Sequence, residues 1–240
     1  MTRPGAKRQG RFRPIQMRAG FGAFLRRRWT AAGNPWRHLH CRCLPSVSSA
    51  ASLRQTRLPR NRDVLLLVDV VNPLNFPGAD VLLPGAVRAA RATLRLREQL
   101  EGRHVPVIYA NDNYGTWHSE FSDLLAACRQ LPGARGELAR LMSPRPRDLT
   151  LLKPCHSAFQ STPLLHLLRQ MGTQRVIVAG LAADMCVMLS ATDARMLGYD
   201  VWVPGDCTAA ESPARKRNAL RQLEQAFRCD VRPGVSASGN

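Results

Sequence analysis

The sequence predicts an α/β fold in which helices cover both faces of a mostly parallel β-sheet. Short apolar runs rich in Val, Leu and Ile recur through residues 63–231. Such runs are typical of strands that are buried on both faces of a parallel sheet. Segments with helical periodicity separate these runs. Because the two patterns alternate along the chain, they indicate a single sheet built from β-α-β units.

Each apolar run defines one expected strand. The runs predict strands at residues 64–68, 105–110, 149–152, 175–179 and 200–203, and a further short strand is expected at 227–231. Helices are predicted at 84–101, 119–128, 163–171, 184–197 and 211–227, whereas 132–147 is expected to be largely loop. Helix ends support this division, because Gly102 fits a helix stop and Pro163 fits a first helical position with Ser161 or Thr162 as its cap.

The net charge of +18 is concentrated at the N-terminus. Residues 1–62 contain fifteen Arg or Lys and no Asp or Glu, which leaves 20 basic and 17 acidic residues for the rest. The segment shows neither helical nor strand periodicity, so we expect a disordered arm at 1–62, followed by one folded domain at 63–240. Three roles remain open beside a solvated tail: nucleic-acid binding through this arm only, organelle targeting, or absence from the mature protein.

The seven cysteines are widely spaced and form no Cys-x-x-Cys pair. Cys41 and Cys43 lack a second pair of ligands at zinc-site spacing, so no zinc site is expected there, and a weak metal site with the nearby His38 and His40 is the alternative. Reduced thiols and a cytoplasmic protein are the simplest interpretation. No apolar run reaches the roughly 18 residues of a membrane span, and neither a Gly-rich dinucleotide loop nor a P-loop occurs, so no cofactor is expected.

Three chemically complementary residues follow predicted strands. Asp69 comes after 64–68, Lys153 after 149–152, and Cys186 lies where the strand at 175–179 turns into the next helix. The ends of parallel strands meet at one edge of a sheet, so these side chains can converge. A cysteine nucleophile needs a base, which Asp69 can supply if its pKa is raised, and a cation, which Lys153 can supply.

Each of these residues also has a plain structural explanation. Asp69 can cap a turn, Lys153 can lie on the surface, and Cys186 can be an inert buried thiol. The composition favours a role for the lysine, since the chain has 32 Arg and only three Lys. A position at the start of a helix also predicts a lowered pKa for the Cys186 thiol, because unpaired backbone N–H groups there favour an anion.

Over about residues 63–231 the sequence resembles the isochorismatase-like cysteine hydrolases. The resemblance rests on Asp69 after its strand, Lys153 followed by Ser157-Ala-Phe159 and Thr162, Gly180-Leu-Ala-Ala-Asp184-Met-Cys186-Val187, and the later Asp193-Ala194, Gly198-Tyr199 and Val203-Pro-Gly-Asp206. It implies a Rossmann-like α/β/α fold and an Asp-Lys-Cys triad that hydrolyses C–N bonds of small amides or ureido compounds. It also implies a homo-oligomer.

The same resemblance implies a non-proline cis peptide between Leu181 and Ala182 and an oxyanion hole formed by the N–H groups of Ala182 and Cys186. Two departures concern the substrate. Ala183 replaces the usual Thr, and Val71 replaces a common Gln. The Asp-x-His pattern that binds metal in nicotinamidases is missing after Asp112, which argues against a metal-dependent nicotinamidase.

The expected function is therefore a metal-independent cysteine amidohydrolase. The substrate pocket is expected to be lined by Leu74, Phe76, Asn111, Trp117 and Phe159. Ordinary packing in loops or in the core is the alternative for each of these. A catalytically silent relative that serves as a binding or scaffold protein is the alternative for the whole chain.

Overall fold

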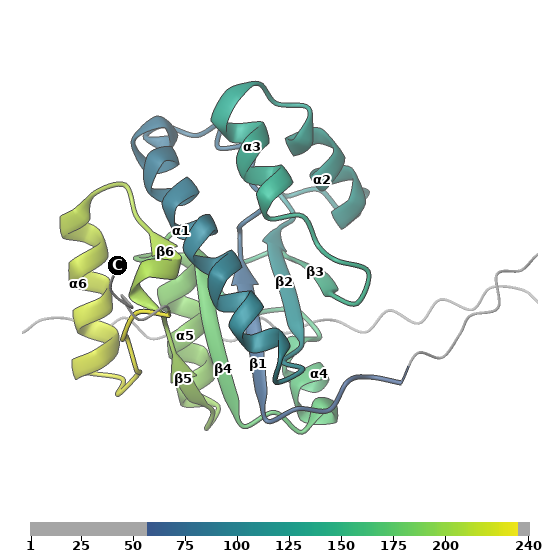
Figure 1. Cartoon of the computed structure of the whole chain (residues 1–240), viewed down its shortest axis with the longest axis vertical. Coiled ribbons are helices and arrows are strands. Elements are labelled where there is room, and N and C mark those ends of the chain that lie inside the picture. Colours follow the sequence, from purple (N-terminus) through teal and green to yellow (C-terminus); the bar gives the residue numbers. More distant parts are fainter. Residues whose placement is uncertain (1–56, 235–240) are drawn as a thin grey trace, which may run out of the picture. The chain divides into compact units, whose positions relative to one another are not determined.

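The computed structural model describes residues 57–234 and confirms the predicted α/β class (Figure 1). Most of the basic arm lies outside the described residues, so its expected disorder stays a prediction. The elements in chain order are β1 (Asp63–Val68), α1 (Ala79–Glu101), β2 (Val107–Asp112), α2 (Phe121–Arg129), α3 (Gly133–Leu141), β3 (Leu149–Lys153), α4 (Leu164–Met171), β4 (Arg175–Leu181), α5 (Cys186–Met196), β5 (Asp200–Trp202), the 3-10 turn η1 (Gly205–Cys207), β6 (Thr208–Ala209) and α6 (Pro213–Gln225).

The sheet has the strand order β3-β2-β1-β4-β5, with the short β6 beside the end of β4. Every pair of neighbouring strands is parallel. The chain first adds strands on one side of β1 and then continues on its other side with β4. The order therefore reverses between β1 and β4, and in open α/β sheets ligands bind at the carboxyl ends of the strands beside such a reversal.

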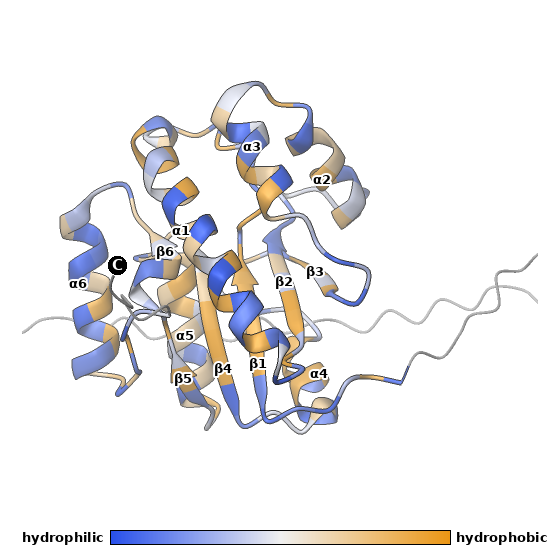
Figure 2. Ribbon diagram, viewed as in Figure 1, coloured by the Kyte–Doolittle hydropathy of each residue, from blue (hydrophilic) through white to orange (hydrophobic). Residues whose placement is uncertain are grey.

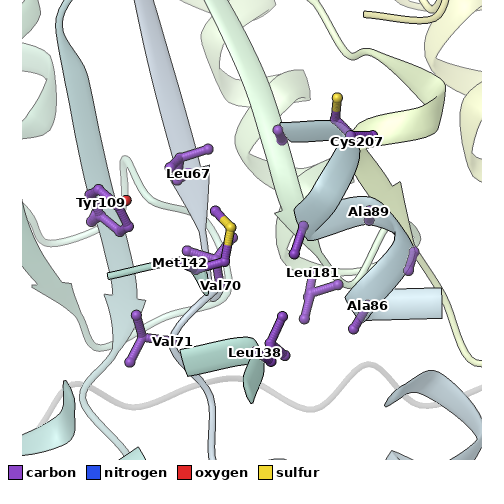
Figure 3. Close-up of a cluster of buried hydrophobic side chains, with 14 of the residues drawn as sticks. Leu67, Val70, Val71, Ala86, Ala89, Tyr109, Leu138, Met142, Leu181 and Cys207 are labelled. Atoms are coloured by element: carbon purple, nitrogen blue, oxygen red, sulfur yellow. The ribbon is translucent and has the colours of Figure 1, made fainter. Parts of the chain in front are cut away.

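Helices pack on both faces of the sheet, so the fold has three layers. One buried cluster joins alternate residues of β1 and β2 to α1, α2 and α3, and Figure 3 shows part of it, with Leu67, Tyr109 and Leu138 among its members. A second cluster joins the other face of the strands to α4, α5 and α6. In Figure 2 the central strands are apolar along most of their length. Burial on both faces explains this, because each side chain of such a strand faces one core or the other.

Three expectations about individual elements were wrong. Residues 133–141 form α3, because Leu138 and Ala139 are buried against the core that also contains α1. Helix α1 begins at Ala79, so Pro84 lies inside it, and burial of Ala79 and Leu82 extends the helix beyond the proline. At 227–231 only an isolated bridge forms, between Trp202 and Asp230.

The end of β4 lies very close to β1. Gly180 has φ of 124°, and a Cβ atom there would lie 2.0 Å from the Val68 carbonyl oxygen. Only glycine tolerates both this backbone conformation and this close approach. The glycine in the predicted motif therefore brings the segment after β4 against the end of β1.

Within residues 57–234, no helix combines the length and apolarity that crossing a bilayer requires. The five cysteines in this part of the chain are free thiols.

Candidate active site

The three predicted catalytic side chains meet at the carboxyl edge of the sheet. Asp69 follows β1, Cys186 begins α5 after β4, and Lys153 is the last residue of β3. The strand β2 separates β1 from β3, so only a long side chain can reach across from β3. The long side chain of Lys153 spans this gap, so a residue of β3 can reach residues that follow β1 and β4.

Lys153 lies within reach of both other members of the predicted triad. Its Nζ is 2.9 Å from Asp69 Oδ2 and 3.6 Å from Cys186 Sγ. The same ammonium donates to the Cys155 carbonyl oxygen at 3.2 Å, and Asp112 Oδ2 lies 3.9 Å away. Lys153 is fully buried, so its charge acts on these neighbours with little screening by water.

Asp69 is the buried carboxylate of the site. Only 4% of its surface is exposed, and its Oδ1 accepts a hydrogen bond from the Asp112 backbone N–H at 2.8 Å. Burial raises the pKa of Asp69 above its ordinary value, against the opposing effects of Lys153, Cys186 and the Asp112 N–H. This is the direction that a catalytic base requires, and it agrees with the sequence-based expectation.

The Cys186 thiol does not follow the expectation of a lowered pKa. Burial, reinforced by the Asp69 carboxylate, raises the pKa of Cys186 to about 12, although Lys153 acts in the opposite direction. These two effects outweigh the lowering of the pKa that the start of α5 would cause. When the proton moves from Cys186 to Asp69, however, the repelling carboxylate disappears and Lys153 remains, so the two groups are suited to share one proton.

Lys153 itself stays charged. Burial alone would lower its pKa, but the charges of Asp69 and Cys186 outweigh this, and the net effect is a raised pKa for Lys153. The ammonium therefore stabilises whichever of its two partners carries the negative charge.

The segment between β4 and α5 presents free backbone donors beside the thiol. The Leu181–Ala182 peptide bond is cis, as the resemblance implies. The Ala183 N–H donates to the Ala209 carbonyl, and the N–H of Met185 donates to that of Ala182. Within residues 57–234, by contrast, the N–H groups of Ala182, Asp184 and Cys186 donate to no acceptor. Two of these are the donors expected to form the oxyanion hole.

The family model of the isochorismatase domain matches residues 63–231, which is most of the chain. The chain belongs to the isochorismatase family.

Among curated members of the isochorismatase family, the uncharacterised protein YaaI of Bacillus subtilis is 30% identical, over 70% of this chain and 91% of its own length. The ureidoacrylate amidohydrolase RutB of Methylorubrum extorquens is 31% identical, over 68% of this chain and 77% of its own. The crystal structure of N-carbamoylsarcosine amidase from Thermoplasma acidophilum superimposes with a TM-score of 0.57 at 24% identity, over 75% of this chain and all of that one. This last likeness supports the fold.

Three polar residues near the triad were not predicted from the sequence. His156 Nδ1 lies 3.5 Å from Cys186 Sγ, and Asp112 contacts both Asp69 and Lys153 as described above. Tyr114 is 44% exposed, yet burial of its hydroxyl and the nearby Asp69 carboxylate raise its pKa. Asp112 ends β2, while Tyr114 and His156 follow β2 and β3 within three residues, and this position is the signal that could have identified them.

The predicted pocket residues fall into two groups. Leu74, Asn111 and Phe159 are buried, whereas Phe76 and Trp117 are exposed at 38% and 79%. Asn111 Nδ2 donates to the Val71 carbonyl at 2.6 Å, so this side chain fixes the turn that follows Asp69. Contact of any of the five with substrate stays a prediction. Within the described part of the chain, no cluster of three or more His, Cys, Asp or Glu side chains is suited to a metal ion.

The raised pKa of Asp69 predicts the acid limb of the pH–rate profile. Below its pKa the carboxyl group holds a proton and cannot take the one on Cys186, so kcat/KM is lost as the pH falls. We expect the midpoint of this loss above 3.8, the ordinary value for Asp. The profile should be measured for wild type and for His156→Gln, because the imidazole also faces Cys186. A midpoint at or below 3.8 in both proteins would contradict a raised pKa at Asp69.

Proposed function

We propose that this protein hydrolyses a C–N bond of a small amide or ureido compound through an acyl-enzyme on Cys186. The observation that carries the proposal is the position of the buried Lys153 ammonium, within reach of both the Asp69 carboxylate and the Cys186 sulfur. A nucleophile, a base and a shared cation in contact are the parts that acyl transfer to a thiol requires. RutB, which acts on a ureido compound by its name, supports the substrate class.

In the first half-reaction Asp69 takes the proton of the Cys186 thiol as Sγ attacks the carbonyl carbon of the substrate. Lys153 stabilises the negative charge, which moves from Asp69 to the sulfur. The C–N bond then breaks, and the proton held by Asp69 passes to the departing nitrogen. The products are a free amine or ammonia and a thioester on Cys186, with Asp69 ionised again.

Stabilisation of the intermediate is assigned to the backbone N–H groups of Ala182 and Cys186. Both are free in the described part of the chain, and the Cys186 N–H belongs to the residue that carries the attacking sulfur. The carbonyl oxygen becomes negative during the attack, and each such donor is worth roughly 3–4 kcal/mol in acyl transfer. This charge develops only during the reaction, so the donors favour the transition state over the bound substrate.

The test is a measurement of ammonia release across primary amides, ureido acids and hydroxamates of small size. We expect release from at least one compound of the amide or ureido classes, with a stoichiometric acid product. No release from any member of the panel by protein whose Cys186 is shown to be reduced would contradict the proposed activity and favour the silent relative.

A further inference from the structure

His156 lies beside Cys186, the proposed nucleophile. Its Nδ1 lies 3.5 Å from Cys186 Sγ, while the imidazole is exposed to solvent. Asp69 and Lys153, by contrast, are buried at 4% and 0% exposure. The sulfur therefore has two proton-transfer groups of different access to water, a buried carboxylate and an exposed imidazole.

The position of His156 is fixed by contacts on both sides of it in the chain. The preceding residue, Cys155, accepts a hydrogen bond from Lys153 Nζ through its carbonyl oxygen at 3.2 Å. The following residue, Ser157, donates to Asp193 Oδ2 at 2.6 Å, and Asp193 belongs to α5, the helix that begins with Cys186. The loop that carries His156 is thus tied to the triad lysine at one end and to the helix of the nucleophile at the other.

The two half-reactions of a thioester mechanism make different demands on a base. In the first, the proton starts on Cys186 and ends on the leaving nitrogen, and the Asp69 carboxylate shares the Lys153 ammonium with the sulfur. In the second, the proton comes from a water molecule, which must approach the thioester from solvent. His156 is both exposed and beside the sulfur, and histidine is the side chain that most often acts as a base in catalysis.

We propose that His156 is a catalytic residue of the second half-reaction, the base that activates water to hydrolyse the thioester on Cys186. This inference rests on the acyl-enzyme of the proposed function. Neutral His156 takes one proton from water as the oxygen attacks the thioester carbon. The C–S bond then breaks, the sulfur leaves as a thiolate beside Lys153, and the imidazolium returns the proton to Sγ. The carboxylic acid product leaves, and the resting thiol is restored.

The experiment uses p-nitrophenyl acetate as the probe, because its leaving group departs without being protonated and its release reports acylation directly. In His156→Gln we expect the burst of nitrophenolate to keep its wild-type rate, with an amplitude near one per Cys186. The steady-state rate that follows should fall by roughly 10²-fold. The acetyl group should accumulate on the peptide that contains Cys186, as detected by mass spectrometry. Added imidazole should restore turnover in His156→Ala.

His166→Gln is the matched control, because His166 is an exposed histidine on α4 outside the site, and it should behave as wild type. The inference is overturned if His156→Gln leaves the steady state unchanged, or if it slows the burst and the steady state equally. A different result marks failure of the proposed function itself: wild type and Cys186→Ala would then give the same nitrophenolate release, and no acetyl group would appear on Cys186.

Discussion

Cys186→Ala is expected to lower turnover by roughly 10⁴-fold or more, because loss of a nucleophile removes the covalent route entirely. Among the described cysteines, only Cys186 has its sulfur within hydrogen-bond distance of Lys153. The fold should survive. Alanine favours a helical first turn, and the buried ion pair of Asp69 and Lys153 remains complete without the sulfur.

The measurement is turnover of the substrate found by ammonia release, together with the urea unfolding midpoint of each variant. Cys229→Ala is the matched control. Cys229 is likewise a buried free thiol, but it packs in the core cluster that contains Leu223 of α6. It should lose some stability and keep its activity per folded molecule. Residual turnover of Cys186→Ala within tenfold of wild type would refute the role of Cys186 as nucleophile.

The sequence predicts the fold class and the meeting of the triad because both follow from periodicity and topology. Apolar runs define the strands, and polar residues after parallel strands must lie at one edge. Asp69 and Cys186 follow the two strands between which the strand order reverses, and this could be deduced only from the pairing of β1 with β4. The motifs around Lys153 and Cys186 carry the family resemblance, which implies the role of each of the three residues.

Features that depend on tertiary burial were not predictable in this way. The helix α3 contains Gly133 and Gly136, which lower helix propensity, and it exists because its apolar side chains find a core. A Cβ on Gly136 would lie 2.0 Å from the Leu131 carbonyl oxygen, so the glycine serves a close approach that local sequence cannot reveal. The predicted lowering of the Cys186 pKa was wrong for the same reason, because burial raises this pKa by more than the helix N-terminus lowers it.

Lys153→Met is expected to be the most destabilising single change in the site, at about 3–5 kcal/mol near neutral pH. It leaves the Asp69 carboxylate buried without its cation, and the ion pair is closed to water on both sides. The loss should depend on pH. Burial already raises the pKa of Asp69, and removing Lys153 takes away the largest opposing effect. The folded protein then binds a proton that the unfolded chain releases, so stability falls as pH rises.

Urea unfolding of Lys153→Met at acidic and at mildly basic pH measures this dependence. The double variant Asp69→Asn/Lys153→Met is the control, because it removes both charges and should recover most of the stability without recovering turnover. A Lys153→Met protein that is as stable as wild type at mildly basic pH would contradict the role of Lys153 as the cation that offsets the buried Asp69 carboxylate.

Lys153→Arg separates charge from geometry at the same position. Arginine keeps the positive charge, yet a guanidinium is planar and larger than an ammonium. The Lys153 Nζ fills a fully buried site and contacts Asp69, Cys186 and the Cys155 carbonyl at once. A planar group cannot keep all three contacts without displacing the loop that carries His156. We therefore expect turnover to fall by roughly 10²-fold or more while much of the stability lost in Lys153→Met is retained. Near-normal turnover would mean that the site needs only a positive charge, and that the convergence of these contacts on one atom has no catalytic role.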